Sequence, residues 1–132
     1  MQTTLVVPTT KNKELVDISS AVQAEIERWG CPSGVLFLFV PHTTAAVTIN
    51  ENADPAVQTD LILSLTTAFP DHPAFRHLEG NSDAHVMASL TGSSETLFIE
   101  KGRPVLGTWQ GIYLAEFDGP RKRRVILKCL PG

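Results

Sequence analysis

Three histidines in polar, small-residue surroundings are the side chains of this chain best suited to chemistry. They are His42, which follows Pro41, and then His77 and His85, which lie eight positions apart across a Gly-Asn turn. Imidazole is the commonest protein ligand for transition metals, and it moves protons near neutral pH. Three histidines around an open fourth position form a catalytic zinc site. If the fold brings the three together, we expect a site that holds a metal ion or does acid–base work.

Each histidine also has a plainer interpretation. A single histidine is more often a hydrogen-bonded structural residue than a ligand, and the spacing here matches no standard metal motif such as His-Glu-x-x-His. His72, between Asp71 and Pro73 in a polar loop, is expected to be exposed to solvent. Convergence of the other three histidines is therefore a hypothesis about the tertiary structure.

Glu116 is the most informative carboxylate, because it stands in the apolar segment from Ile112 to Phe117. Strand alternation places it on the same face as Ile112 and Leu114, which would point it inward. A buried carboxylate needs a partner, either a cation or a metal-bound histidine. An exposed position at a sheet edge fits the sequence equally well.

Two segments carry groups that suit a phosphate. Ser93 and Ser94 follow Gly92 at the end of an expected helix, where hydroxyl and backbone N–H groups can cradle an anion. Arg121 opens the only basic run, residues 121–124, and an arginine can bind a phosphate bidentately. An ordinary Gly-Ser connection and a solvated hairpin end are the alternatives for these two segments.

A third segment, Gly107-Thr108-Trp109-Gln110-Gly111, is suited to binding the ring of a ligand. Its glycines permit close approach of a ligand to the backbone, Trp109 offers an aromatic face and Gln110 an amide. A hairpin loop with Trp109 packed in the core is the alternative.

Hydrophobic periodicity and turn residues predict the elements that must position these groups. Asp54 and Pro55 are typical of a helix start, and Gly30 of a helix end. Val57, Leu61 and Leu65 are expected to form the buried stripe of the second helix. The expected helices are residues 19–29, 55–68 and 82–90, and the expected strands are residues 3–7, 15–18, 34–40, 43–50, 96–100, 105–107, 112–117 and 124–130.

These elements predict an α+β fold, a curved and mostly antiparallel sheet or sandwich with about three helices, in a single domain over residues 1–132. The continuous apolar run from Val35 to Val40 is typical of a central strand buried on both faces. It is far shorter than the about 20 residues of a membrane span. With a net charge of −3, the chain is not expected to bind nucleic acid. Cys31 and Cys129 are expected to be reduced in a cytoplasmic protein.

The ordered motifs together resemble the YjbQ-like family, also called secondary thiamine-phosphate synthases. The matching residues cover nearly the whole chain and are Pro41-His42-Thr43-Thr44-Ala45, Ile49-Asn50-Glu51-Asn52-Ala53-Asp54-Pro55, His77, Glu79-Gly80-Asn81-Ser82-Asp83-Ala84-His85, Gly92-Ser93-Ser94, Gly107-Thr108-Trp109-Gln110-Gly111-Ile112 and Glu116-Phe117-Asp118-Gly119-Pro120-Arg121. The first thirty residues and the segment 71–73 carry no resemblance.

The resemblance implies a YjbQ-like fold, a homotrimer, and a polar pocket near a subunit interface that contains His42, His77 and His85. It also implies a divalent metal, with Zn²⁺ held by these histidines, or Mg²⁺ arriving with a pyrophosphate substrate. Weak thiamine-phosphate synthase activity is associated with the family: a pyrimidine pyrophosphate and a thiazole phosphate are joined and pyrophosphate is released.

Under that resemblance the expected site residues have roles. The histidines and Glu116 are the expected catalytic groups, and the expected ligand-binding residues are Asn52, Asn81, Ser93, Ser94, Trp109, Gln110 and Arg121. Two other functions fit the same residues: a metal-dependent hydrolase of a small phosphorylated or cyclic metabolite, and a non-catalytic protein that binds a metal or a metabolite.

Overall fold

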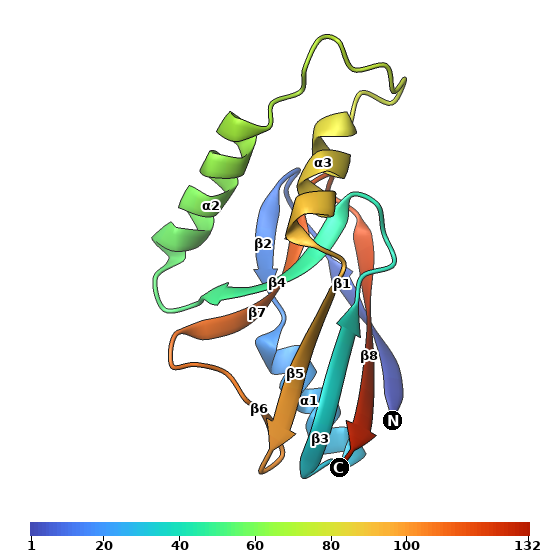
Figure 1. Ribbon diagram of the computed structural model, residues 1–132, viewed down its shortest axis with the longest axis vertical. Coiled ribbons are helices and arrows are strands. Elements are labelled where there is room, and N and C mark those ends of the chain that lie inside the picture. Colours follow the sequence, from blue (N-terminus) through green and yellow to red (C-terminus); the bar gives the residue numbers. More distant parts are fainter.

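Five strands form one curved antiparallel sheet, and three more form a second, smaller one (Figure 1). The computed structural model describes all residues from 1 to 132. The larger sheet has the order β1 (Gln2–Pro8), β8 (Lys122–Pro131), β3 (Ser33–Phe39), β5 (Ser94–Glu100) and β6 (Arg103–Pro104). The smaller has the order β2 (Glu14–Asp17), β7 (Gln110–Glu116) and β4 (Ala45–Glu51). Every strand pair is antiparallel, so the predicted α+β class and strand direction are confirmed.

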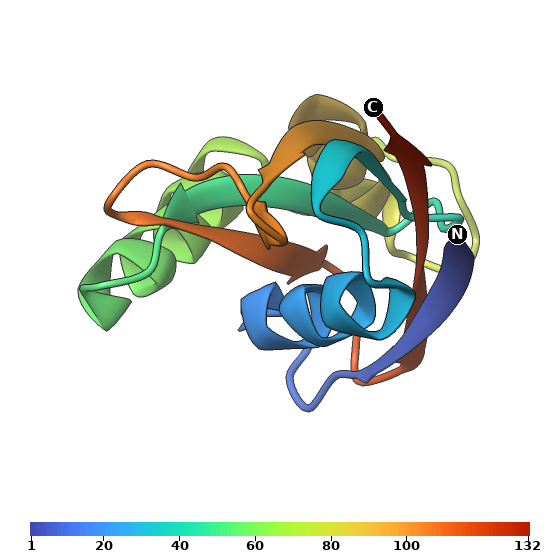
Figure 2. The same cartoon turned by 90° about the horizontal axis from the view of Figure 1, so that it is seen from below.

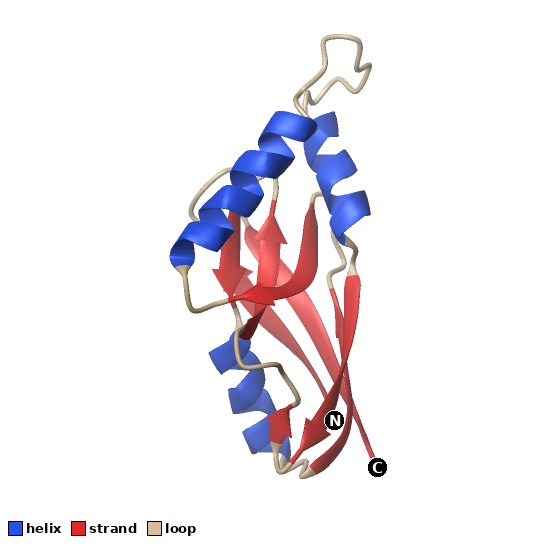
Figure 3. Ribbon diagram, turned by 60° about the vertical axis from the view of Figure 1, so that its left-hand side comes forward, coloured by secondary structure: helices blue, strands red, loops and turns tan.

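Three helices complete the fold: α1 (Ser19–Trp29), α2 (Pro55–Ala68) and α3 (Ser82–Thr91). Figure 2 shows α1 against the concave side of the strands, whereas Figure 3 shows α2 and α3 together at the opposite end of the molecule. No helix is long and apolar enough to cross a membrane.

The helix ends largely follow the predicted chemistry. Asp54 accepts a hydrogen bond from the Ala56 N–H at 2.9 Å, and Pro55 opens α2. Gly30 ends α1 in the left-handed conformation at φ 64°. At the start of α1, Asp17 accepts the Ser19 N–H, while the Ser19 hydroxyl accepts the Ile112 N–H across to β7.

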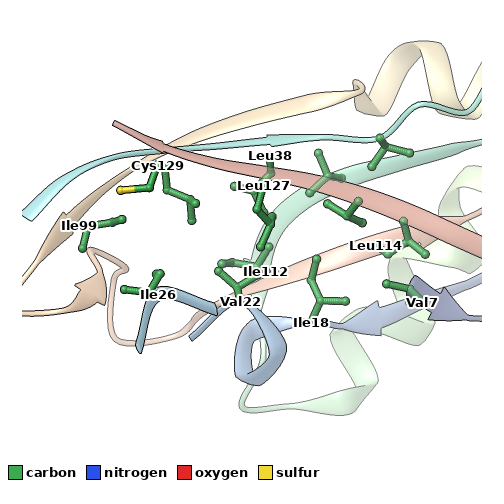
Figure 4. Close-up of a cluster of buried hydrophobic side chains, with 14 of the residues drawn as sticks. Val7, Ile18, Val22, Ile26, Leu38, Ile99, Ile112, Leu114, Leu127 and Cys129 are labelled. Carbon is green, nitrogen blue, oxygen red and sulfur yellow. The ribbon is translucent and has the colours of Figure 1, made fainter. Parts of the chain in front are cut away.

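The main hydrophobic core lies between α1 and the inner faces of both sheets (Figure 4). Val22 and Ile26 of α1 meet Leu127 of β8 and Ile112 and Leu114 of β7, all without solvent exposure. Val22 and Ile26 are four positions apart, so they lie on one face of α1, and this is the face that the helix buries. A second cluster under α3 contains Met87, Ala115 and Phe117.

The prediction that the strand at residues 34–40 is buried on both faces is wrong. Its residues alternate, so that Leu36 and Leu38 are buried while Phe37 and Phe39 are 40% and 46% exposed. The reason is that α1 covers only the inner face of the larger sheet. Strand β7 is the one buried on both faces, between the α1 core and the α3 cluster.

The apolar residues on the opposite side of the larger sheet form what we term the outer sheet face. Strand register places Val35 beside both Phe98 and Leu130, and Phe39 beside Ile126. No helix covers them, and Phe98 and Leu130 are 65% and 50% exposed. The outer sheet face is defined by Val6, Val35, Phe37, Phe39, Phe98, Ile126 and Leu130.

Helix α2 packs more loosely than predicted. Val57, Leu61 and Leu65 are only partly buried, and no residue of the helix is fully buried. The smaller sheet has only three strands, so the helix extends past it and part of its apolar stripe has nothing to pack against. The expected stripe therefore faces the sheet without forming a closed core.

Candidate functional site

A cleft of about 520 Å³ lies where β3 passes into β4, at the end of the larger sheet. His42 stands in the connecting segment, and Ser93 precedes β5 beside it, because the Val40 N–H donates to the Ser93 carbonyl at 2.8 Å. The lining residues are Phe39, Val40, Pro41, His42, Thr43, Thr44, Ser93, Arg121 and Arg123. The structure therefore brings together three of the predicted residues, namely His42, Ser93 and Arg121.

The tautomer of His42 follows from its hydrogen bond. Nε2 of His42 accepts the backbone N–H of Arg124 at 2.9 Å, so this nitrogen carries no proton in the neutral ring. The proton of neutral imidazole then lies on Nδ1, which has no acceptor within the protein. His42 thus offers the cleft a free N–H donor.

Charges and burial favour this neutral form. Burial, followed by the positive charges of Arg123 and Arg124, lowers the pKa of His42 below its ordinary value of 6.5. The ring is neutral at pH 7, and its contribution to stability declines as the pH falls below 6.5, because the unfolded chain binds the proton more readily.

Glu116 is fully buried, and its partner is a cation. Arg123, only 3% exposed, binds this carboxylate through Nε at 2.7 Å and through Nη2. The Thr9 hydroxyl and the Asp118 N–H complete its hydrogen bonds, both at 2.9 Å. Burial alone would raise the pKa of Glu116, but these hydrogen bonds outweigh it and hold the pKa below its ordinary value. The inward orientation predicted for Glu116 is confirmed, and no histidine is among its hydrogen-bond partners.

The same ion pair supports the wall of the cleft. Nη2 of Arg123 also donates to the Thr44 hydroxyl at 2.8 Å and to the Thr44 carbonyl at 3.2 Å. Thr44 lies two residues after His42, and Arg123 comes directly before Arg124, whose N–H holds the imidazole. Glu116 therefore positions His42 through Arg123 from beneath the cleft.

A second network joins α3 to the cleft through Asp118. Asn81, at the N-terminal end of α3, donates from Nδ2 to Asp118 at 2.8 Å instead of capping the helix. Arg121 donates to the same carboxylate oxygen at 2.7 Å and to the Asp118 carbonyl at 2.8 Å. Oδ1 of Asn81 is buried without a partner, and Nη1 of Arg121 has no protein acceptor. Asn81 does not line the cleft, so of these two atoms Nη1 of Arg121 is the one placed to meet a ligand there.

His77 and His85 lie beside one another at the start of α3. Their ring centroids are 5.4 Å apart with the planes nearly perpendicular, and Glu79 lies 4.0 Å from Nε2 of His77. The fold-back across the Gly-Asn turn is thus as predicted, and His72 is exposed as expected. No group of three or more His, Cys, Asp or Glu side chains in the chain is arranged to hold a metal ion. The three predicted histidine ligands therefore do not form a metal site within one chain.

The predicted ring-binding loop lies at the other end of the smaller sheet. Gln110 pairs with Glu51, whereas Glu116 pairs with Ala45, six residues along β7. At about 3.4 Å per residue the two ends are about 20 Å apart. Trp109 is 63% exposed, so the alternative of a core tryptophan is wrong. Trp109, Gln110 and Asn52 thus form a surface separate from His42 in the same chain.

Two hydrogen bonds and one close approach of the backbone fix the conformation of the loop around Trp109. The Gln110 side chain accepts the Gly107 N–H at 2.8 Å, and the Asn52 N–H donates to the Trp109 carbonyl at 2.9 Å. A Cβ on Gly111 would lie 2.8 Å from Cβ of Asn52, so the glycine permits this close approach. Ser94 lies within β5 and is exposed.

Sequence reasoning missed Arg123, Thr44 and Thr9 as partners of the site. A signal existed for Arg123, because alternation along β8 places it on the same face as Val125, Leu127 and Cys129, all of them buried. Thr9 and Thr44 had no such signal, since they reach Arg123 and Glu116 only through the tertiary fold.

Comparisons with known proteins agree with one another. The model of the family described as "UPF0047 protein YjbQ-like" matches residues 3–132. A UPF0047 protein of Methanocaldococcus jannaschii is 50% identical over 124 residues, which cover 94% of this chain and 90% of that protein. The UPF0047 protein YugU of Bacillus subtilis is 46% identical over 131 residues, covering 98% and 99% of the two chains.

Solved structures show the same fold. A conserved hypothetical protein of Thermus thermophilus has a TM-score of 0.91 at 46% identity and covers 97% of this chain and 99% of its own. A YjbQ-like protein of unknown function from Sulfolobus solfataricus has a TM-score of 0.94 at 30% identity, over 100% and 97% of the two chains.

Proposed function

The chain belongs to the UPF0047 YjbQ-like family, and we propose that it is a small-molecule enzyme that binds a phosphorylated substrate in the His42 cleft. The observation that carries this proposal is the set of unpaired donors around one cleft. These are the Nδ1–H of neutral His42, Nη1 of Arg121 and the exposed hydroxyl of Ser93.

An anion suits these donors better than a cation. Arg121 lines the cleft and the positive charge of Arg124 acts on His42, while the acidic Glu116 is neutralised by Arg123. A hydrogen bond from a charged guanidinium to phosphate is about twice as strong as a neutral one. A phosphate or pyrophosphate group is therefore the part of the substrate that we place here.

The reaction that fits best is a transfer of the thiamine-phosphate synthase type. The bond between the methylene carbon of the pyrimidine and the pyrophosphate oxygen breaks, pyrophosphate leaves, and the same carbon forms a bond to the ring nitrogen of the thiazole phosphate. Arg121, Ser93 and the Nδ1–H of His42 would stabilise the charge that develops on the leaving pyrophosphate. Asn81 would act indirectly, because its Nδ2 holds the Asp118 carboxylate that also holds Arg121.

The assay that tests this proposal supplies the two substrates together and then one at a time. We expect thiamine phosphate and pyrophosphate to appear in equal amounts only when both are present. Release of phosphate or pyrophosphate from one substrate and water would indicate a hydrolase. Binding of pyrophosphate without any turnover would indicate a non-catalytic binding protein.

A homotrimer is part of the proposal, and the outer sheet face supports it. Phe37, Phe39 and Phe98 are exposed on a sheet with no covering layer, and contiguous apolar surface of this kind marks interaction sites. Phe39 also lines the cleft, so a neighbouring copy on this face would form one of its walls. The loop that carries Trp109 and Gln110 is remote from His42 in its own chain. In such an assembly it would be able to contact a neighbouring copy.

Replacement of Phe98 by lysine is expected to convert the trimer to a monomer, because a charge within the face would lose its water on assembly. Leu63→Lys is the matched control, since Leu63 is 62% exposed on α2, away from the outer sheet face. Light scattering after size-exclusion chromatography gives the two masses. A trimeric Phe98→Lys, or a monomeric wild type, would contradict the assembly.

A divalent metal remains a proposal that needs groups from outside one chain. The neighbouring rings of His77 and His85 would supply two ligands for zinc, and substrate oxygens or a neighbouring copy would supply the others. Nε2 of His42 is already occupied by the Arg124 N–H, so only its Nδ1 would be free to bind. Mg²⁺ would instead arrive on the pyrophosphate of the substrate.

Metal analysis of purified protein separates these possibilities. We expect His77→Ala and His85→Ala to lose bound zinc, whereas the exposed His72→Ala should retain the content of wild type. His42→Ala shows whether its Nδ1 joins the site. Wild-type protein without zinc, or equal content in all variants, would remove the metal from the proposal.

A further inference from the structure

We propose that Cys31 and Cys129 form a site of reversible oxidation, at which an intramolecular disulfide ties the end of α1 to β8. The two residues are 98 positions apart in the sequence, yet their sulfur atoms lie 2.8 Å from each other. A disulfide bond is about 2.05 Å long, so a small side-chain movement joins them. Their proximity is a product of the fold, independent of the proposed function.

Each of the two thiols has the other as its main polar neighbour. Cys31 and Cys129 are 1% and 2% exposed and belong to the main core. Figure 4 shows Cys129 among the buried side chains of that core. The only other polar contact is from Cys31 Sγ to the Ser33 carbonyl at 3.4 Å. Two thiols without further ligands do not complete a tetrahedral zinc site, and no larger ligand group exists around them.

Cys31 is only 1% exposed, but it belongs to the lining of a cleft of about 410 Å³, from which a reagent can approach its thiol. Gly30 and Pro32 line this cleft beside it, together with Lys101 and Arg103. These two basic side chains outnumber the one acid of the cleft, Glu27, which favours an anionic reagent such as oxidised glutathione. Cys129 does not line the cleft, so Cys31 is the first thiol to react.

The reaction is a thiol–disulfide exchange in two steps. The Cys31 thiolate attacks one sulfur of the small disulfide, whose S–S bond breaks and releases one small thiol. Cys129 then loses its proton and attacks Cys31, which forms the protein disulfide and releases the second small thiol. Two protein thiols are oxidised and one small disulfide is reduced. Burial, with a further contribution from the Cys31 hydrogen bond, raises the pKa of Cys129 to about 11, so the second step accelerates with pH.

The disulfide would cross-link the fold over most of its length. Closing a loop of about 100 residues restricts the unfolded chain strongly, so we expect the midpoint of thermal unfolding to rise on the order of 10 °C. Cys31 precedes β3 and His42 follows it, at opposite ends of the strand. Pyrophosphate affinity at the His42 cleft is therefore expected to be unchanged.

The test treats the folded wild-type protein with oxidised glutathione at pH 8.5. We expect the intact mass to fall by about 2 Da, both thiols to disappear when counted in denaturant, and dithiothreitol to reverse the change. Non-reducing peptide mapping should recover a peptide that links Cys31 to Cys129. This measurement uses the wild-type protein, so it does not depend on a variant that folds. Cys129→Ser should show a glutathione adduct at most, and no loss of mass.

Three outcomes would overturn the proposal. They are two thiols that persist after treatment, a stable glutathione adduct on wild type, and a disulfide between two chains seen on a non-reducing gel. Each would mean that the two sulfurs do not react with one another in the folded protein.

Discussion

Replacement of Arg123 by methionine is expected to lower the free energy of unfolding by about 3–5 kcal/mol, since it leaves the buried Glu116 without its cation. The carboxylate is fully buried, and only the Thr9 hydroxyl and the Asp118 N–H would remain as its hydrogen-bond donors. Urea unfolding at pH 7 measures the change. The double variant Glu116→Leu with Arg123→Met should be less destabilised than Arg123→Met, because no charge then stays buried.

Arg28→Met is the control for this experiment. Arg28 pairs with Glu25 at 2.6 Å, but its side chain is 59% exposed, so the loss is expected to be below about 1 kcal/mol. Equal destabilisation of the two variants would show that burial does not set the strength of the Glu116 pair.

The pH dependence follows from the lowered pKa of Glu116. The stability that this group contributes is complete above its ordinary pKa of 4.5 and is lost as the pH falls through the lower folded value. Without Arg123, burial raises the pKa of Glu116 in the variant, so its carboxylate takes up a proton while the pH is still above 4.5. The difference between wild type and Arg123→Met should therefore begin to shrink above pH 4.5 and go on shrinking as the pH falls through the lower folded value of the wild type.

Replacement of Arg121 by alanine is expected to weaken pyrophosphate binding by about 10- to 100-fold. One hydrogen bond to a charged group contributes about 1.5–3 kcal/mol, and about 1.4 kcal/mol is a factor of ten. Arg121 lies at the mouth of the cleft with its side chain half exposed, so its loss should leave the fold intact. Titration calorimetry with inorganic pyrophosphate gives the dissociation constants.

Arg28→Ala is again the matched control, because both arginines pair with a carboxylate three residues earlier and both are largely exposed. Unchanged affinity in Arg121→Ala, or equal weakening in the two variants, would show that the His42 cleft does not bind the anion. Arg121→Lys should recover part of the affinity, since it keeps the charge without the bidentate geometry.

The two hydrogen-bond networks have different roles at the cleft, one in stability and the other in ligand binding. Glu116 and Arg123 lie beneath it and hold Thr44, while Asp118 holds Arg121 at its mouth and Asn81 beside it. Substitutions in the first network should change stability, and substitutions of Arg121 should change ligand affinity. The two predictions above therefore test separate parts of one site.

Local chemistry made several elements predictable. Asp54 and Pro55 start α2 and Gly30 ends α1, because capping depends on residues within one turn of the helix. The fold-back of His77 onto His85 also follows from local chain direction. The burial of β3 on one face and of β7 on both was not predictable, because it depends on which layers cover each strand.

The amino-acid sequence by itself determined the class of fold, most of its helices and strands, and the residue types that suit a phosphate site. For Glu116 it left an inward face and an exposed edge position open, and burial in the tertiary structure decided for the inward one. Tertiary structure alone decided the partners. The Arg124 N–H meets His42 and Cys31 meets Cys129 because β3 and β8 pair antiparallel and bring distant parts of the chain together. Arg123 meets Glu116 across the connection between β7 and β8, where the chain passes from one sheet to the other. The ends of β7 then separate Trp109 from His42 by the length of a strand, which residue types cannot reveal.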